Sequence, residues 1–210
     1  MRKSILTISV LLAASLPLAA QAGVFDIVSK VTDSGSGGGD AVAQQDELVN
    51  SYVAANKEVL MAQYKMANAL GAKEAAALAK AEADALSSGA TKDSLSKADA
   101  VQSDVSKAIT ERQKAVGNKM DEASKKEYAS GLGSLGKGLL KYAGMAPKFS
   151  AFKNSLTTIS PTMLTKLNSG AYIVQSFPGN SKNLYDTLGS SISFAKSNDI
   201  PVPADATKAL

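Results

Sequence analysis

The fold of this chain is set by a long helical region whose first part is the stretch 40–70, DAVAQQDELVNSYVAANKEVLMAQYKMANAL. It contains no proline, and its apolar residues recur at intervals of three, four and seven positions, which is the spacing of an amphipathic helix. One stripe consists of Val42, Val49, Val53, Leu60 and Ala67. Asp40 is the expected N-cap, because a short acidic side chain can accept a hydrogen bond from a free backbone N–H group. We therefore predict a long helix that begins at Asp40.

The helical composition continues through Gly71 and an alanine-rich stretch to Leu86, and residues 87–89, SSG, then break it. Glycine is typical just past a helix end, and Thr91 or Ser94 can begin the next helix. Apolar residues beyond the break repeat at nearly heptad spacing, namely Leu95, Ala98, Val105, Ile109, Val116, Met120, Ala123 and Tyr128. We predict that residues 40–143 form one long antiparallel hairpin of two helices, with at most a bend at Gly71.

Shorter helices are expected in residues 144–200, where four of the five phenylalanines lie. Ser160-Pro161 is a typical helix start, and residues 178–180, PGN, are typical of a turn. These helices should complete a bundle at the base of the hairpin, while the alanine-rich tip at 72–100 should project as a thin stalk. Residues 201–210 should be a frayed tail. No stretch alternates with a period of two, so the predicted fold class is all-α, a helical bundle.

The N-terminus has the organisation of a secretory signal peptide. Arg2 and Lys3 precede an uncharged apolar run at 5–16, and residues 20–22, AQA, form a small-x-small cleavage site. The run is shorter than the roughly 20 residues that span a bilayer. We therefore predict a signal peptide at 1–22, cleaved after Ala22, and a periplasmic or secreted protein of the Gram-negative type. Residues 23–39 are a short apolar segment followed by a Gly/Ser linker.

The composition argues against several classes of protein and site. The chain has no cysteine, so it forms no disulfide and carries no lipid on a cysteine. Cleavage after Ala22 would remove two basic residues and no acidic one, so the net charge falls from +4 to +2. Lysines and arginines do not gather into a stripe with interleaved aromatic residues, so nucleic acid is not an expected partner.

The sequence offers no catalytic or cofactor motif that fits its context. Residues 131–136, GLGSLG, match the dinucleotide-binding pattern, but a charged helical stretch precedes them and no acidic residue follows before Asp186. Histidine is absent as well as cysteine, which removes Ser-His-Asp and Cys-His catalysis and the common zinc sites. The acidic pairs Glu82/Asp84 and Asp121/Glu122 are expected on solvated helix faces. We predict that the protein is not an enzyme and holds no cofactor or metal.

Residues 131–142, GLGSLGKGLLKY, are unusual because four glycines lie within eight positions. Each glycine costs about 1 kcal/mol relative to alanine inside a helix, so the glycines need a reason. One explanation is close approach of a neighbouring helix. Another is an apolar, cationic segment that contacts a membrane or a partner, and a third is a plain loop. The candidate contact residues are Gly131, Leu132, Leu135, Lys137, Leu139 and Leu140.

These observations predict an exported, non-enzymatic helical protein that acts through protein–protein contact, as an adaptor or as a secretion or envelope-associated component. The expected partner is another protein or a second copy of the chain. Tyr52, Tyr64 and Met66 are contact candidates if they prove exposed. The alternative is a lipid- or membrane-binding protein, including a pore-forming-like protein, that places residues 131–142 on a membrane surface.

Overall fold

The computed structural model of this chain describes residues 38–116 and 119–210. The predicted signal peptide, the short apolar segment and most of the Gly/Ser linker lie outside the described residues. Within the described residues the chain is helical and contains no strand, which confirms the predicted all-α bundle. The helices are α1 (Gly38–Ala69), α2 (Lys73–Ala85), α3 (Lys92–Val116), α4 (Glu122–Gly144), α5 (Ala146–Ser155), α6 (Pro161–Leu164), the 3-10 helix η2 (Thr165–Leu167), α7 (Asn168–Ser197) and α8 (Ala204–Lys208).

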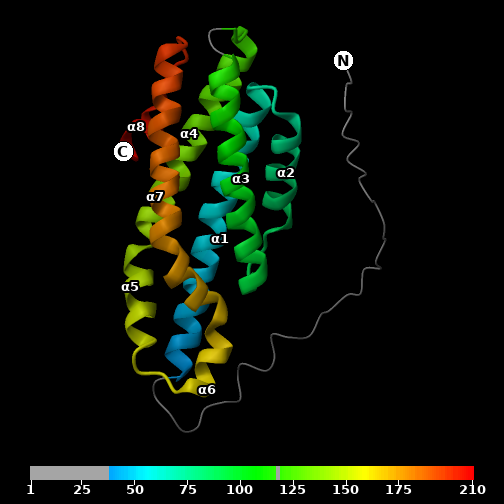
Figure 1. The fold of residues 1–210 in the computed structure, drawn as a ribbon. Helices are drawn as coiled ribbons and strands as arrows, with labels where there is room; N and C mark the ends of the chain where they lie inside the picture. The colour runs from blue at the N-terminus through cyan, green and yellow to red at the C-terminus, as the bar shows by residue number, and fades with distance from the viewer. Residues whose placement is uncertain (1–37, 117–118) are drawn as a thin grey trace, which may run out of the picture. The chain divides into compact units, whose positions relative to one another are not determined.

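The central helix of the bundle is α1, against which α2, α3, α4, α5 and α7 all pack (Figure 1). Because neighbours surround it, residues on several of its sides are fully buried, including Leu48, Leu60 and Ala62. The helix begins at Gly38, so Asp40 lies in its first turn and not at the N-cap. Val42, the first member of the predicted stripe, is 37% exposed, so the stripe leaves the core at this end.

The predicted long helix is wrong beyond Ala69, because the chain reverses direction at Gly71. This glycine has a φ of +70°, in the left-handed region. Its N–H donates to the carbonyl of Asn68 at 2.9 Å, and the N–H of Ala72 donates to the carbonyl of Ala67 at 2.8 Å. These two bonds form a Schellman motif, which ends a helix by satisfying its last free carbonyl groups.

The reversal returns α2 along α1. Arg112 of α3 donates through Nε and Nη2 to the carbonyl of Leu70, at 3.1 and 3.0 Å. At the other end of α2, the Nζ of Lys57 in α1 donates to the carbonyl of Leu86 at 3.0 Å. The alanine-rich segment therefore packs against α1 and α3, and the prediction of a projecting stalk at 72–100 is wrong.

The predicted return helix is also two helices. Thr91 directly precedes α3, and its Oγ1 accepts a hydrogen bond from the N–H of Ser94 at 3.3 Å, as expected of an N-cap. α3 ends at Val116, and α4 begins after Asp121, whose carboxylate accepts from the N–H of Ser124 at 2.7 Å. α3 packs against α1, α2 and α7, whereas α4 packs against α1, α7 and α8. The predicted single hairpin is therefore replaced by four helices.

The predicted turn at 178–180 is wrong, because α7 continues through Pro178. Proline costs about 3 kcal/mol in a helix interior, since it removes a hydrogen bond and clashes with the preceding turn. Ile173, Leu184 and Leu188, on either side of it, are buried, and burial of each such side chain contributes about 1.5–3 kcal/mol. Packing of the flanking residues thus outweighs the local cost. The predicted helix start at Ser160-Pro161 matches the start of α6.

The C-terminal residues pack on the bundle, so the predicted frayed tail is wrong. α8 packs against α4, and Ala206 is completely buried. The Nζ of Lys137 in α4 lies 3.7 Å from the carboxylate of Asp205. The last residues are therefore a structural part of the bundle.

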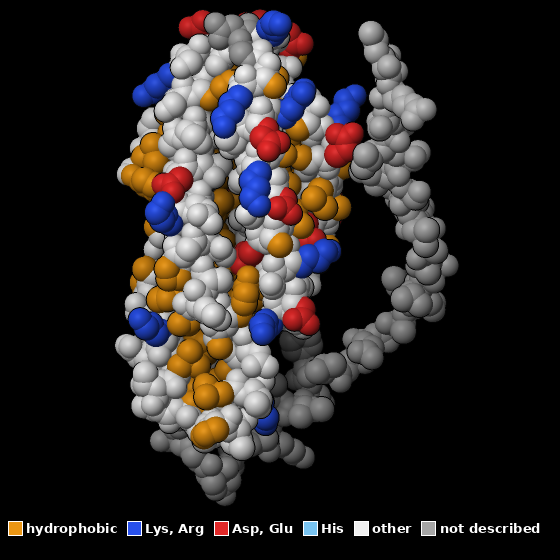
Figure 2. All heavy atoms as spheres, viewed as in Figure 1, with side chains coloured by type: hydrophobic (Ala, Val, Ile, Leu, Met, Phe, Trp, Pro, Cys, Tyr) orange, Lys and Arg blue, Asp and Glu red, His pale blue; other side chains and the backbone are white. Residues whose placement is uncertain are grey.

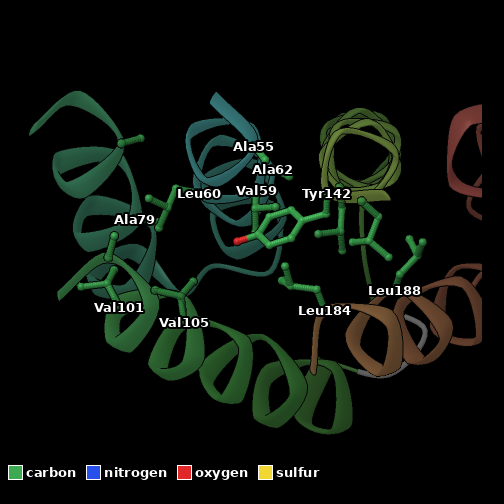
Figure 3. Close-up of a cluster of buried hydrophobic side chains, with 14 of the residues drawn as sticks. Ala55, Val59, Leu60, Ala62, Ala79, Val101, Val105, Tyr142, Leu184 and Leu188 are labelled. Atoms are coloured by element: carbon green, nitrogen blue, oxygen red, sulfur yellow. The ribbon is translucent and has the colours of Figure 1, made fainter. Parts of the chain in front are cut away.

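The helices share one hydrophobic core. Figure 3 shows Leu184 and Leu188 of α7, Tyr142 of α4 and Val59 of α1 pointing into the space between their helices. On the other side of α1, Val101 and Val105 of α3 lie near Leu60 of α1 and Ala79 of α2 (Figure 3). The alanines of α2 allow that helix to lie close to α1 and α3.

Candidate functional site

A groove of about 500 Å³ lies between α3 and α7. Most of its lining residues are polar or charged: Asp99, Gln102, Ser103, Ser106, Lys107, Thr110, Glu111 and Lys114 from α3, and Asn180, Asn183, Leu184, Asp186 and Thr187 from α7. Figure 2 shows acidic and basic side chains interspersed along α3 on this face of the molecule. A groove of this volume has the size of a ligand site, although its walls are more polar than those of most small-molecule pockets.

Asp99 stands at one end of the groove and joins three helices. Its carboxylate accepts hydrogen bonds from the hydroxyl of Tyr52 in α1, at 2.9 Å from Oδ1 and 2.8 Å from Oδ2. From α7, the Tyr172 hydroxyl donates to Oδ2 at 2.6 Å and the Asn180 Nδ2 donates to Oδ2 at 2.7 Å. Asn180 also donates to the Tyr52 hydroxyl at 2.8 Å. We call these four residues the Asp99 cluster.

Burial sets the electrostatics of the Asp99 cluster. It raises the pKa of Asp99, and the hydrogen bonds from Tyr172, Tyr52 and Asn180 oppose this rise only in part. Burial, together with the hydrogen bond to Asp99 and its charge, raises the pKa of Tyr172 to about 12. The pKa of Tyr52 is raised further by the same causes. Both hydroxyls therefore keep their protons at neutral pH and act as hydrogen-bond donors.

A buried amide network continues from the Asp99 cluster behind the groove. The Nε2 of Gln63 donates to the backbone carbonyl of Gln102 and to the Ser106 hydroxyl, each at 2.8 Å. Gln102 in turn donates from its side chain to Asn56, and Asn56 donates to the carbonyl of Tyr52 at 3.1 Å. Such a network holds the groove wall of α3 at a fixed position relative to α1.

Aromatic rings support the Asp99 cluster from within the core. The Tyr52 ring packs edge to face on Tyr142, with centroids 5.5 Å apart. Tyr142 stacks on Phe177 at 5.6 Å, and Phe177 packs on Phe149 at 5.0 Å. Such packing limits the movement of the Tyr52 ring and so fixes its hydroxyl beside Asp99.

The glycine-rich segment 131–142 forms part of α4, and its glycines lie at helix contacts. A Cβ on Gly131 would come within 2.6 Å of the Met66 Cγ and 2.9 Å of the Ala62 carbonyl oxygen. A Cβ on Gly138 would come within 2.7 Å of the Val59 Cγ2. These contacts show that two glycines let α4 approach α1 closely.

The other two glycines lie on the opposite face of α4, since a helix advances about 100° per residue. A Cβ on Gly133 would lie 3.2 Å from the Pro203 Cβ, and one on Gly136 would lie 2.6 Å from the Cα of Ala206. At these glycines α4 has no side chain. α1 therefore packs directly on the α4 backbone on one face, and the C-terminal residues pack on it on the other.

The predicted contact residues of this segment are placed as follows. Gly131, Leu132, Leu135 and Leu139 are buried, Lys137 is exposed, and Leu140 is 40% exposed. A membrane or partner contact through the three buried leucines would require α4 to separate from its neighbours, and it stays a prediction. Tyr52 and Met66 are fully buried, and Tyr64 is half-buried.

The acidic pairs named from the sequence serve local structure. Glu82 is buried, against expectation, and its Oε2 lies 2.8 Å from the Nζ of Lys97. Asp84 pairs with Lys80 at 2.7 Å. Within 38–116 and 119–210, no group of three or more acidic residues is arranged to hold a metal ion.

The sequence reasoning missed the Asp99 cluster. Asp99, Gln102, Ser106 and Gln113 follow one another at helical spacing beside the apolar stripe of α3, and Tyr52, Asn56 and Gln63 do so on α1. Polar residues at helical spacing beside the apolar residues of both α1 and α3 indicate that the two helices share a buried polar contact.

Comparison with known proteins adds no functional assignment. No family model matches the chain, and no curated protein or solved structure is significantly similar to it. In the described part of the chain, no helix combines the length and the apolar character needed to cross a bilayer.

Proposed function

We propose that this chain is an exported, non-enzymatic helical protein that acts by binding a protein partner, and that the α3–α7 groove is its contact surface. The main support for this contact surface is the polar groove itself, which has the Asp99 cluster at one end. Three helices and a buried amide network hold the polar groups of this groove in place. Polar groups that are fixed before binding lose little entropy when a partner arrives.

The protonation state of Tyr172 favours hydrogen-bond donation over acid–base catalysis by this residue. A general acid or base works best when its pKa lies near the operating pH. Tyr172 has a pKa of about 12 and is protonated, so it donates a hydrogen bond and does not abstract a proton. Asp99 is held as an acceptor by three neutral donors. Such an arrangement orients a ligand.

Export rests on the sequence at 1–22, with its basic start, apolar run and small-x-small site. The proposal therefore places the partner outside the cytoplasm, in the periplasm or beyond it.

Site-specific photo-cross-linking tests the proposal. p-Benzoylphenylalanine is introduced at Ser103 or Asn183, two exposed positions of the groove, in the cells that export the protein. We expect one discrete protein adduct, with another protein or with a second copy, from both positions. The size of each adduct is read on a denaturing gel, and its identity by mass spectrometry.

The matched control carries the same photoreactive residue at Leu78 of α2, which is exposed and lies outside the groove. This control should yield no adduct of the same size. An adduct from Leu78 with none from Ser103 or Asn183, or no adduct at all, would overturn the assignment of the groove.

A further inference from the structure

Asp99 is the half-buried acidic residue of the groove, and its own fold gives it no counter-ion; Glu111, the other acidic lining residue without a lysine or arginine partner among the described residues, is exposed to solvent. Among the described residues, no lysine or arginine nitrogen lies within 4 Å of its carboxylate, whereas Asp104 and Asp186 pair with lysines at 3.3 and 2.5 Å. Lys107, the next cation of the groove on α3, stands eight residues further on, which is about 12 Å along the helix. The donors that face Asp99 are neutral.

The carboxylate also has acceptor capacity to spare. Two carboxylate oxygens offer about four acceptor positions. Oδ2 accepts from Tyr52, Tyr172 and Asn180, whereas Oδ1 accepts only from the Tyr52 hydroxyl, whose single proton it shares with Oδ2. Since Asp99 lines the groove, we infer that a donor inside the groove reaches its carboxylate, where Oδ1 is the oxygen with fewer partners.

The geometry points to a cationic ligand group at this position: we propose that Asp99 anchors a Lys or Arg side chain carried by the partner segment that occupies the α3–α7 groove. This inference rests on the proposed function and specifies its chemistry. A charge-assisted hydrogen bond from an ammonium or guanidinium is about twice as strong as one from a neutral donor. It also supplies the counter-ion that a desolvated carboxylate lacks.

The length of the groove favours a peptide segment over a free amine. The lining of α3 runs from Asp99 to Lys114, which is about 22 Å along the helix. An extended chain of six or seven residues covers about that distance. The hydroxyl of Ser103 and the amide of Asn183 border this path and can bond a peptide backbone.

The test is an NMR titration of the full-length isotope-labelled protein with N-acetyl-arginine amide. N-acetyl-citrulline amide is the matched probe, because it has the same length without the charge. We expect saturable shifts of the Asp99 carboxyl carbon and of the Asn180 side-chain amide with the arginine probe, and about tenfold weaker binding of the citrulline probe. Equal binding of the two probes, or shifts that leave Asp99 unaffected, would overturn the anchor.

Two variants localise the effect. Asp99→Asn should weaken arginine binding about tenfold. Ser103→Lys is a second variant that leaves the cluster intact: its ammonium lies one helical turn from Asp99 and occupies the site within the chain. It should abolish arginine binding, whereas Ser103→Gln should retain it. Retained binding in both Asp99→Asn and Ser103→Lys would refute the proposal.

The outcomes separate this inference from the proposed function. Cross-linking at Ser103 without arginine binding at Asp99 would leave the partner surface standing and remove the anchor. Arginine binding without a cross-linked protein would mean that the groove takes a small free cation, which overturns the partner-segment proposal.

Discussion

Gly131 of α4 lies against Met66 of α1 so closely that a Cβ on the glycine would come within 2.6 Å of the Met66 Cγ. The Ala62 carbonyl oxygen, which is backbone and cannot rotate away, would be 2.9 Å from the same Cβ. The helix pair is therefore built for a residue without a side chain at this position.

Gly131→Ala should lower the free energy of unfolding by about 1–2 kcal/mol, because overpacking outweighs the better helix propensity of alanine. Urea unfolding followed by circular dichroism measures it. Gly189→Ala in α7 is the control, since a Cβ there meets nothing within 4 Å, and it should be neutral or slightly stabilising. Equal stability of the two variants would contradict the close-packing explanation.

Gly71→Ala should lower the free energy of unfolding by about 1–2 kcal/mol, because a side chain is disfavoured at positive φ. The glycine has a φ of +70°, and a Cβ would also lie 3.2 Å from the Arg112 Nη2. Gly179→Ala in α7 has neither constraint and serves as the comparison. If Gly71→Ala unfolds at the same urea concentration as Gly179→Ala, the Schellman ending of α1 is not a determinant of stability.

The Asp99 cluster makes stability depend on pH in a defined direction. The folded protein raises the pKa of Asp99 above its ordinary 3.8, so between that value and the raised one the folded state binds more protons than the unfolded state. The contribution of Asp99 to stability is then full at lower pH and is lost as pH rises through this interval. Thermal unfolding from pH 4 to 7 should show wild type losing stability relative to Asp99→Asn. A relative gain with rising pH would reverse this sign.

Tyr172→Phe should remove one donor to Asp99 and raise the pKa of that carboxyl further, since the hydrogen bond now lowers it. The expected loss of unfolding free energy is about 1 kcal/mol, at the low end for a charged acceptor because Tyr172 is half-buried. Tyr185→Phe is the matched control: its hydroxyl donates to the Leu210 carbonyl at 2.8 Å at the surface. A carbon-13 titration of Asp99 and urea unfolding together check the prediction, and an unchanged Asp99 pKa would contradict the role of Tyr172.

Membrane binding through residues 131–142 predicts a different result from the groove proposal. Because Leu132, Leu135 and Leu139 are buried, we expect the folded protein to stay in the soluble fraction when it is floated with anionic lipid vesicles. Flotation of wild type that is lost in Leu140→Asp would instead support the alternative. Leu140 is suited to this test because it is 40% exposed, so the variant should fold.

The fold class was predictable because the helices carry their apolar residues at regular spacing. Leu95, Ala98, Val105 and Ile109 were identified as core residues from sequence, and all four are buried. The number of helices was not predicted, because a glycine such as Gly71 can either bend a helix or end it, and the contact that accompanies the ending, from Arg112 to the Leu70 carbonyl, joins residues 42 positions apart. Pro178 shows the opposite case, since buried neighbours hold a helix where the local residues favour a turn.

The candidate site was missed for a related reason. The charge of Asp99 fits a solvated face as well as a buried one, and its partners lie 47, 73 and 81 positions away in the sequence. Only the packing of the helices shows whether Asp99 lies on a solvated face or in a buried contact. The glycine-rich segment was correctly identified as unusual, but only the position of α8 explains why glycines occur on two faces of one helix.

The two glycine faces of α4 have a mechanical consequence. A layer of flexible side chains between helices can absorb a small displacement, whereas backbone in contact with backbone cannot. A shift of the C-terminal residues around Ala206 would therefore be transmitted through α4 to the backbone of α1 at Ala62. The C-terminal residues are thus coupled to the central helix, and a tag or truncation placed after residue 200 should change the packing of α4 on α1.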